Sequence, residues 1–340
     1  MAAAPFPTTF RAFRYVQHGK PDKVLQLRPR VAQAPLGSAQ VRVKVHSAAI
    51  NPIDIALVPN YTPDHLHSHP TEDKPFGIGF DGAGTIVEVG ASVDPARLRV
   101  GDNVYFMMPF TEFGTFAEYL TVDADFVALK PKNMSFDQAA CVPLVALTSY
   151  QALVEYCQLK KGERVLILGG SSATGFVAIQ LAKAIGAHVI TTTSDKNFDF
   201  VKSFGADQLI DYTNEKWVDV LPPHSIDVLY DCGMEPMSWN SDAQTVLTKN
   251  SGRYVTLWPL PNPIEPRFGA KLVGSILVYP SASQLDELTK LIEAGKIVIP
   301  IDSVFALEQV LDAIARIKTR RATGKIVIQI ANAERQTSAL

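Results

Sequence analysis

Cysteine is scarce in this sequence: Cys141, Cys157 and Cys232 are the only three among 340 residues. They lie far apart and form no CxxC pair, which excludes a disulfide-stapled fold and a cysteine-rich zinc site. Long apolar runs are lacking as well, because none approaches the ~20 residues needed to cross a bilayer. Neither sign of charge dominates, with Lys+Arg 32 against Asp+Glu 34. We therefore expect a protein of a reducing compartment, the cytoplasm, that binds neither membranes nor nucleic acid.

The rest of the composition is typical of a folded globular protein, with 47% hydrophobic and 19% charged residues. A chain of 340 residues exceeds one ordinary core, so two domains are expected. The first third predicts β-structure, because short, valine-rich, partly alternating segments are separated by Gly and Pro. The predicted strands are 10–15, 24–28, 40–49 and 84–89. Residues 58–74 have no periodicity and predict a long surface loop of the kind that borders active sites.

Strands and helices alternate in the second part of the chain. Ser135 with Gln138 is typical of a capping box and predicts a helix over 136–158. The clearest unit then consists of a strand at 164–168, a small-residue turn at 169–175, a helix at 176–185 and a strand at 188–193. A further helix is predicted at 198–204, strands at 208–210, 228–230 and 253–257, and finally a helix at 307–318 and a strand at 325–330. This alternation predicts an α/β fold with a doubly wound parallel sheet.

The turn at 169–175 carries the strongest functional signal. Gly170 and Gly175 flank four small residues at the point where a strand leads into a helix. Such a turn directs backbone N–H groups and the positive end of a helix dipole at one point, which favours binding of a pyrophosphate. Ser172 stands where the middle glycine of a GxGxxG motif belongs, and serine tolerates this turn. We predict a dinucleotide site at Gly170, Ser171, Ser172, Ala173, Thr174 and Gly175, against the alternative of a tight turn without a ligand.

The end of the next strand indicates which dinucleotide binds. NAD sites carry an Asp or Glu about 20 residues after the turn, where it accepts from the ribose 2′-OH. Here the strand ends in threonines and Ser194, and Lys196 follows closely. Hydroxyls and an ammonium suit a 2′-phosphate, whereas a carboxylate would repel it. Asp195 is interpreted as a turn residue that faces water, so the sequence favours NADPH as the cofactor.

Seven motifs in order span nearly the whole chain. They are Asn51–Asp54 (NPID), Gly79–Gly84 (GFDGAG, counted from Gly79), Val100–Asp102, Gly114–Tyr119, Pro143 with Thr148–Ala152, the turn at 169–175, and Gly324–Val327. In this combination the chain resembles the medium-chain dehydrogenase/reductase superfamily, in its zinc-independent branch of quinone oxidoreductases and alkenal or enone reductases. The resemblance implies a GroES-like, mostly antiparallel β domain of residues 1–128 and 299–340. It also implies a Rossmann domain of residues 129–298, with the active site in the cleft between the two.

The resemblance implies further that no metal is bound. In the zinc alcohol dehydrogenases of this superfamily, a Cys occupies the place of Asn51 and a His the place of Phe80. A family glutamate corresponds to Asp81, which alone cannot form a site because catalytic zinc needs three protein ligands. The alternating histidines His65, His67 and His69 are interpreted as surface residues rather than as metal ligands.

Residue roles follow from the same branch by position. The resemblance implies that Ser194, Lys196 and Tyr212 hold the adenosine 2′-phosphate. It implies that the nicotinamide half is lined by Gly233, Thr256, Leu257, Trp258, Leu277, Val278 and Tyr279. As alternatives, Tyr212 is an ordinary surface aromatic, and a strand at 277–279 is plain sheet core or an edge used for dimer pairing.

Three residues are catalytic candidates. The resemblance places Asn51 and Thr148 beside the nicotinamide and its ribose. Many family members carry a tyrosine two residues beyond the position of Asp54, where this chain has Ala56. Tyr61 is therefore the nearest candidate for a proton donor, with an ordinary loop aromatic as the alternative.

The predicted function is NADPH-dependent reduction of an electron-poor conjugated carbonyl, either a quinone or the carbon–carbon double bond of a 2-alkenal or enone. The expected partners are this small-molecule substrate and a second copy of the chain in a homodimer. One alternative is an enoyl-thioester reductase acting on an acyl-CoA or acyl-carrier substrate, for which Arg320 and Arg321 would offer a basic cluster. Another is a catalytically idle NADPH-binding protein with a structural or RNA-associated role.

Overall fold

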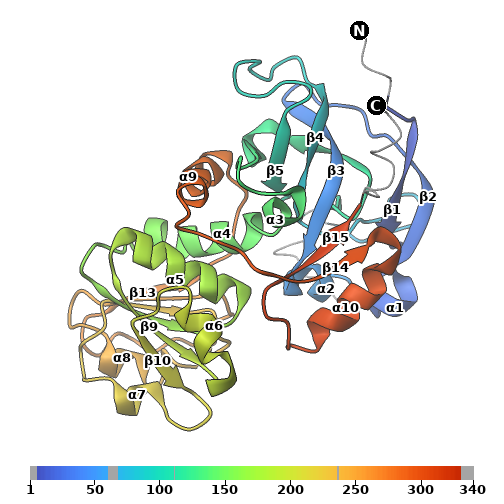
Figure 1. The fold of residues 1–340 in the computed structure, drawn as a ribbon. Coiled ribbons are helices and arrows are strands. Elements are labelled where there is room, and N and C mark those ends of the chain that lie inside the picture. Colours follow the sequence, from blue (N-terminus) through green and yellow to red (C-terminus); the bar gives the residue numbers. More distant parts are fainter. Residues whose placement is uncertain (1–5, 60–67, 111, 236, 331–340) are drawn as a thin grey trace. The chain divides into compact units, whose positions relative to one another are not determined.

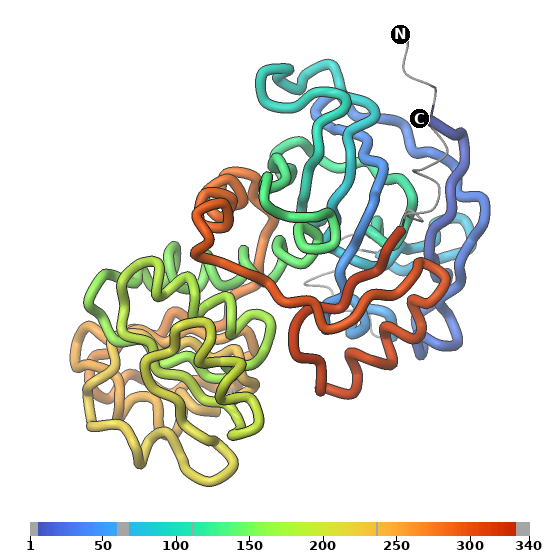
Figure 2. Tube along the Cα trace, in the orientation of Figure 1, coloured from blue at the N-terminus to red at the C-terminus, as the bar shows by residue number. Residues whose placement is uncertain are grey.

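A computed structural model describes residues 6–59, 68–110, 112–235 and 237–330 of the chain (Figure 1). The chain folds into two compact units. Unit 1 consists of Met1–Leu144, Pro280–Glu293 and Ile299–Leu340, and unit 2 of Val145–Tyr279 and Ala294–Val298. In Figure 2 the blue to teal part of the trace and its red end accordingly belong to unit 1, and the yellow-green and yellow middle of the chain belongs to unit 2. None of the helices within the described ranges has the length and apolar character needed to cross a membrane.

Unit 1 is built on a seven-stranded, mostly antiparallel sheet in the order β14-β15-β3-β4-β5-β7, with β6 paired to β3 as well. A second sheet contains β1 and β2. The strands are β1 (Thr9–Arg14), β2 (Gln26–Ala32), β3 (Gln40–Ile50), β4 (Asp81–Val89), β5 (Asn103–Met107), β6 (Tyr119–Asp123), β7 (Val127–Leu129), β14 (Ile301–Ala306) and β15 (Lys325–Gln329). The helices are α1 (Pro21–Val24), α2 (Pro52–Ala56), α3 (Phe136–Ala140), α9 (Ala282–Glu293) and α10 (Val310–Lys318), with 3-10 turns at Ala124–Phe126 and Leu307–Gln309.

The alternation in β3 explains how this sheet forms its core. Val41, Val43 and Val45 are fully buried in one hydrophobic cluster, because every second side chain of a strand points to the same face. The cluster also includes Ile326 and Ile328 of β15. β3 therefore holds together strands from both ends of the chain.

Unit 2 is a six-stranded, entirely parallel sheet in the order β10-β9-β8-β11-β12-β13. Its strands are β8 (Arg164–Leu168), β9 (His188–Thr193), β10 (Gln208–Asp211), β11 (Val228–Asp231), β12 (Arg253–Thr256) and β13 (Lys271–Ser275). Its helices are most of α4 (Pro143–Tyr150), α5 (Ala173–Ile185), α6 (Phe198–Lys202), α7 (Trp217–Val220) and α8 (Ala243–Val246), with a π-helical segment at Gln151–Tyr156 and a 3-10 turn at Asp195–Asn197. The strand order reverses between β8 and β11, which is the switch point where α/β sheets bind ligands. The predicted α/β fold class is confirmed.

Alternate residues of β8 pack in two separate hydrophobic clusters. Val165 and Ile167 pack with Ile179 of α5, whereas Leu166 and Leu168 pack in a separate cluster. That second cluster includes Trp217 of α7, Trp239, and Ala243 and Val246 of α8. Helices therefore cover both faces of the sheet, as an all-parallel sheet requires.

The predicted helix over 136–158 is wrong as a single helix. Its capping box is present, since Ser135 Oγ accepts from the backbone N–H of Gln138 and Gln138 Oε1 accepts from that of Ser135. However, α3 ends at Ala140, and α4 begins only at Pro143. Proline has no N–H to continue a helix and forces the preceding residue out of the helical region.

The division of the chain has the predicted boundary at 298/299 but differs from the predicted one at 128/129. Residues 129–144 and 280–293 group with unit 1 rather than with unit 2. The hydroxyl of Tyr105 in β5 donates to the carbonyl of Leu285 at 2.8 Å and lies 2.8 Å from Thr289 Oγ1, so α9 is fastened to the sheet of unit 1. α3 likewise packs on β3 and β4. The alternation of strands and helices in the sequence does not reveal that the chain returns to unit 1 through α9.

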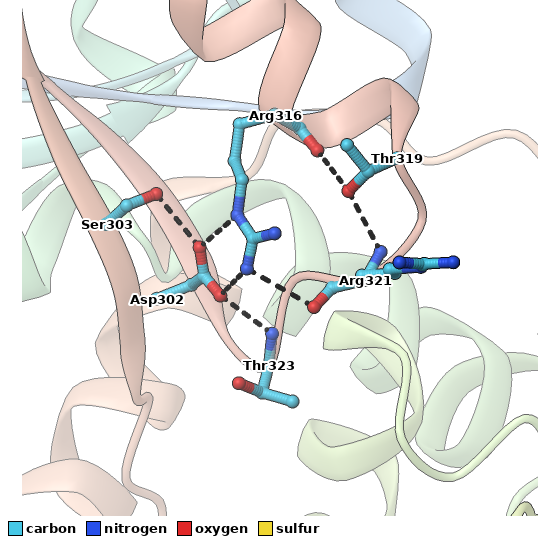
Figure 3. A network of polar contacts seen from close by, with 6 residues as sticks. All are labelled: Asp302, Ser303, Arg316, Thr319, Arg321 and Thr323. Atoms are coloured by element: carbon cyan, nitrogen blue, oxygen red, sulfur yellow. Dashed lines mark hydrogen bonds and ion pairs between the residues drawn. The ribbon is translucent and has the colours of Figure 1, made fainter.

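A polar network fixes the entry into β15 (Figure 3). Arg316 of α10 makes a two-point contact with the carboxylate of Asp302 in β14, at 2.6 and 2.9 Å. The same carboxylate accepts from the backbone N–H of Thr323 at 3.0 Å, and Arg316 also donates to the carbonyl of Arg321. Figure 3 shows the side chain of Arg321 directed away from these contacts. The turn that follows α10 is thus held in place immediately before Gly324 and β15.

Candidate active site

The predicted phosphate turn joins β8 to α5 in unit 2. Ser172 is the N-cap of α5: its Oγ accepts from the backbone N–H of Gly175 at 3.0 Å, and its own N–H donates to the carbonyl of Gly169. This explains why a serine replaces the middle glycine of the motif. The first N–H groups of a helix have no acceptor within the helix, so those of Ala173 and Thr174 can serve an anion at this end.

Two glycines of the turn have no room for a side chain. A Cβ on Gly175 would lie 2.2 Å from the carbonyl oxygen of Gly169, and a Cβ on Gly170 would lie 2.3 Å from Thr191 Oγ1. Gly169 has a φ of +85°, and its added Cβ would lie 2.6 Å from the Cα of Gly233. The turn and the end of β11 therefore approach each other as bare backbone at the switch point, which leaves main-chain surface for a pyrophosphate.

Threonines at the end of β9 tie the turn to the sheet. Thr192 Oγ1 accepts from the backbone N–H of Gly169 at 3.0 Å, and the carbonyl of Thr192 accepts from Gly170 N–H at 2.9 Å. Thr191 Oγ1 donates to the carbonyl of Ile167. The sequence indicates only a neutral strand end at these threonines and does not reveal this structural role.

The candidates for the 2′-phosphate follow the ends of two neighbouring strands. Asp211 of β10 pairs with Thr193 of β9, so Ser194 and Tyr212 come directly after paired residues. Tyr212 is 59% exposed, and Lys196 is exposed as well. Asp195 is exposed and accepts from the backbone N–H of Lys196 at 2.7 Å. Hydroxyl, ammonium and phenol groups are thus available at one edge of the sheet.

Asp231, at the end of β11, holds residues predicted to line the nicotinamide half and was not itself predicted. Its fully buried carboxylate accepts from the backbone N–H groups of Gly233 and Glu235 and from Thr256 Oγ1 at 3.1 Å. Burial raises the pKa of Asp231, whereas these donors lower it. The carboxylate therefore holds the loop that presents Gly233 to the phosphate turn. The sequence signal was an acid at a strand end, where parallel sheets place their functional residues.

The other residues predicted to line the nicotinamide half differ in burial and in secondary structure. Thr256 is fully buried and its Oγ1 accepts from the backbone N–H of Trp258, with Leu257 between them. The strand predicted at Leu277–Tyr279 is wrong, because β13 ends at Ser275. Leu277 and Tyr279 are 47% and 38% exposed, while Val278 is buried. Hydrogen bonds between Gln151 and the backbone of Tyr279 hold this segment outside the sheet.

The three catalytic candidates do not lie in one unit. Thr148 is buried in α4, in the part of the helix that belongs to unit 2. Asn51 lies in unit 1 and caps the N-terminus of α2. Tyr61, together with His65 and His67, lies outside the described residues.

Asn51 belongs to a buried polar cluster at one edge of the unit 1 sheet. Its Nδ2 donates to Asp81 Oδ2 at 2.9 Å, and its Oδ1 accepts from Lys325 Nζ at 2.5 Å. Lys325 Nζ lies 3.4 Å from Asp81 Oδ2 and from the carbonyl oxygen of Ile50. Asp81 Oδ1 accepts from the backbone N–H of Leu144. Asn51, Asp81 and Lys325 are 1%, 0% and 3% exposed.

Asp54 is a second buried carboxyl next to this cluster. Its Oδ2 accepts from the backbone N–H of Asn51 at 2.5 Å, and its buried Oδ1 has no partner within the described part of the chain. Burial, together with the negative charge of Asp81, raises the pKa of Asp54 to about 8, and Asn51 and Lys325 act against that rise. Asp54 therefore carries a proton at neutral pH.

Comparisons with known proteins agree on the family. Residues 37–132 match the model of the alcohol dehydrogenase GroES-like domain, and residues 204–328 match that of a zinc-binding dehydrogenase domain. The 2-methylene-furan-3-one reductase of Solanum lycopersicum is 34% identical over 334 residues, which cover 95% of this chain and 79% of that protein. The chain belongs to the medium-chain dehydrogenase/reductase superfamily.

Two further members of the superfamily extend this result. The chloroplastic NADPH-dependent alkenal/one oxidoreductase of Arabidopsis thaliana is 33% identical over 340 residues, covering 96% of this chain and 81% of that protein. A solved structure of the quinone oxidoreductase from Coxiella burnetii has a TM-score of 0.80 at 29% identity, covering 95% of this chain and 99% of the other. The predicted superfamily and its two kinds of domain are confirmed.

The donor set of this superfamily member does not fit a catalytic zinc ion. Phe80 has no ligating atom, and its ring packs edge-on against Phe110 with centroids 4.8 Å apart. At the other two ligand positions, the side-chain oxygens of Asn51 and Asp81 already accept from the ammonium of Lys325. A divalent cation at these oxygens would be repelled by the ammonium, and the described residues contain no group of three His, Cys, Asp or Glu side chains that could hold it. Lys325 lies in the motif Gly324–Val327, but nothing in the sequence predicts its contact with Asn51 and Asp81.

Proposed function

We propose that this chain catalyses NADPH-dependent reduction of quinones or α,β-unsaturated carbonyls, by hydride transfer without zinc. Relatives at 33–34% identity carry names of a furanone reductase and an NADPH-dependent alkenal/one oxidoreductase, and a structural neighbour is a quinone oxidoreductase. The observation that carries the proposal is the turn at 169–175. It combines a helix N-terminus, two glycines without room for a Cβ, and a neutral strand end followed by Lys196.

The residues of unit 2 suit the parts of NADPH. Backbone N–H groups of Ala173 and Thr174 would bind the pyrophosphate. Ser194, Lys196 and Tyr212 would contact the 2′-phosphate through hydroxyl and ammonium groups. Gly233, held by Asp231, and the segment Thr256–Trp258 would line the nicotinamide half.

The reaction places only modest demands on the protein. When bound, NADPH supplies a hydride that adds to the β-carbon of an enone or to the equivalent position of a quinone. Negative charge then grows on the carbonyl oxygen and must be met by hydrogen-bond donors. Asn51 is the donor that we assign to this role, because its amide is held rigidly by Asp81 and Lys325. The α-carbon of the enolate, or the oxygen of the hydroquinone anion, can take its proton from water, so no side chain has to act as the acid.

The test is to mix the protein with NADPH and either 9,10-phenanthrenequinone or a 2-alkenal and to follow loss of the nicotinamide absorbance. We expect turnover with both acceptors and slower turnover with NADH. Turnover only with an enoyl thioester would replace the proposed substrate class. Binding of NADPH without turnover on any acceptor would contradict the proposal. Activity should also survive dialysis against a zinc chelator, and a loss that added zinc restores would contradict the zinc-independent chemistry.

The proposal includes a homodimer formed through β13. β13 is an outer strand of the unit 2 sheet, so one of its edges has no neighbouring strand within the sheet order. The exposed side chains of Leu277 and Tyr279 follow it and add apolar area beside this edge. An unpaired edge with apolar neighbours suits pairing with a second copy of the chain.

The cytoplasm is the compartment that we propose. Cys141, Cys157 and Cys232 are all free and buried, which suits a reducing environment. The alkenal/one oxidoreductase relative is chloroplastic, so fractionation of cells that express the chain with a C-terminal tag is the deciding measurement. Recovery in an organelle fraction would contradict this assignment.

A further inference from the structure

Three strands bring the polar cluster of unit 1 to one edge of the sheet. β3 ends at Ile50, directly before Asn51, and β4 and β15 begin at Asp81 and Lys325. Ile326 pairs with Ile50, and Asp81 pairs with Ala49. Because both neighbours run antiparallel to β3, the end of β3 and the starts of β4 and β15 coincide. The cluster therefore follows from register and does not depend on a flexible loop.

The chemistry of the partners determines how the Asn51 amide is oriented. An ammonium can only donate, so Lys325 requires the oxygen of the amide, and a carboxylate can only accept, so Asp81 requires the nitrogen. The contacts in the structure satisfy both, at 2.5 and 2.9 Å. The reversed amide would place its oxygen against the carboxylate and its N–H groups against the ammonium. Lys325 and Asp81 thus select one of the two orientations.

This orientation leaves one donor unused. Asn51 Nδ2 carries two hydrogens, and one of them is given to Asp81. No acceptor for the other is recorded within the described ranges of the chain. A buried N–H without an acceptor is costly, so a group that enters the site gains from accepting it.

We propose that Lys325 is a positioning residue of the catalytic centre, whose buried ammonium, anchored by Asp81, fixes the Asn51 amide so that its free N–H faces the carbonyl oxygen of a bound substrate. The ammonium thereby takes the place of the metal cation of the zinc-dependent members of the superfamily. The proposal rests on the proposed function, because it assumes an acceptor whose carbonyl oxygen becomes negative. The ammonium differs from a metal ion in how it acts, because the lysine works through Asn51 rather than by contact with the substrate.

The surrounding fold holds the ammonium in place. The backbone N–H of Lys325 donates to the carbonyl of Pro300 at 2.9 Å. Gly324 has a φ of +125°, and a Cβ there would lie 2.5 Å from the Pro300 carbonyl oxygen. The Asp302–Arg316 contact in Figure 3 fixes Thr323 just before it. Two independent anchors thus set where β15 begins and where Lys325 enters the cluster.

The first experiment is a double-mutant cycle in the full-length protein with NADPH and 9,10-phenanthrenequinone. We expect Lys325→Met to lower kcat by at least about tenfold, since misplacing a catalytic donor by a fraction of an ångström has effects of this size. The KM for the quinone should change less. Asn51→Ala should cause a similar loss, and the double variant should be no slower than Asn51→Ala alone. Losses that multiply, or a wild-type kcat in Lys325→Met, would overturn the proposal.

Matched variants separate the positioning role from stability. Lys318→Met removes an exposed lysine of α10 and should leave kcat unchanged. Lys325→Arg retains the cation and should be faster than Lys325→Met. Should Lys325→Met fail to fold because Asp81 is left as an uncompensated charge, the cycle is run with Asp81→Asn as the common background. In that background loss of kcat on Lys325→Met supports the proposal, and an unchanged kcat contradicts it.

NMR spectroscopy tests the positioning role of Lys325 without a measurement of turnover. In protein with ¹⁵N-labelled lysine and asparagine, a buried, hydrogen-bonded ammonium exchanges its protons slowly and gives a resolved signal. We expect that signal to vanish in Lys325→Arg and the Asn51 side-chain amide signals to move in Lys325→Met. A missing ammonium signal, or unmoved Asn51 signals, would refute the positioning role. If the wild type reduces no acceptor while both signals behave as expected, the proposed function fails and the assigned contact stands.

Discussion

Asp54 shows how strongly one residue can couple the stability of this protein to pH. Its carboxyl is buried, one oxygen lacks a partner among the described residues, and its pKa is raised to about 8. A carboxyl whose pKa is higher in the folded state binds its proton more tightly there. Its contribution to stability is therefore complete below its ordinary pKa of 3.8 and is lost as the pH rises through about 8.

Replacing Asp54 by asparagine should remove this pH dependence. The amide oxygen can still accept from the Asn51 N–H, and the group no longer titrates. Thermal unfolding of the wild type should lose stability between about pH 4 and pH 8, at up to about 1.4 kcal/mol per pH unit. Asp54→Asn should show a shallower decline. Asp73→Asn, at an exposed position, is the control and should follow the wild type; equal slopes for all three proteins would contradict the buried, protonated carboxyl.

Lys196 should decide between the two nicotinamide cofactors. Lys196→Ala should weaken NADPH binding by about tenfold, the loss typical of one hydrogen bond to a charged group. NADH lacks the 2′-phosphate, so its affinity should change little. Dissociation constants from calorimetry give the comparison, with Lys202→Ala as a second exposed lysine of unit 2. An equal loss for both cofactors would show that Lys196 does not contact the phosphate.

At the scale of elements, β8, α5 and β9 form the part of the molecule that we propose binds the phosphates. Backbone contact between Gly175 and Gly169 draws α5 against the end of β8, and Thr192 fastens the turn to β9. The element is held by main-chain contacts rather than by large side chains. A single added methyl group should therefore disturb it.

Gly175→Ala should lower NADPH affinity by at least about tenfold, because its Cβ would lie 2.2 Å from the Gly169 carbonyl oxygen and the turn must open. Titration of NADPH fluorescence measures the loss. Gly162→Ala adds a methyl with nothing within 4 Å and strains only its own positive φ, so it controls for general destabilisation. Unchanged affinity in Gly175→Ala would remove the turn from the site.

The same elements show what the sequence can predict. β8 and β9 have the predicted bounds, because an unbroken apolar segment between turn residues admits few other structures. Leu277–Tyr279 is also an apolar segment but is not a strand. The local sequence does not reveal which apolar segment will pair with a neighbouring strand. The Lys325–Asn51 contact was also not predicted, because residues 274 positions apart in sequence meet only through the register of β15 with β3.

For the whole molecule, the proposed pairing through β13 determines the oligomeric state. Val273→Pro removes a backbone donor from the outer strand and introduces a ring that an edge pairing cannot accept. Light scattering after gel filtration should give a dimer for the wild type and a monomer for this variant. Val304→Pro in β14, an outer strand of unit 1, is the control and should remain a dimer. A monomeric wild type would refute the pairing.

Because the chain leaves unit 1 and later returns to it, the sheet of unit 1 is still incomplete while the ribosome synthesises unit 2. Unit 2 is complete once residue 298 has been made, but β3 lies in the middle of a sheet whose next strand, β15, is made only after unit 2. Throughout synthesis of the intervening segment, the nascent N-terminal sheet has an open hydrogen-bonding edge exposed to other chains. Asn51 and Asp81 meet their cation only after residue 325 has been made.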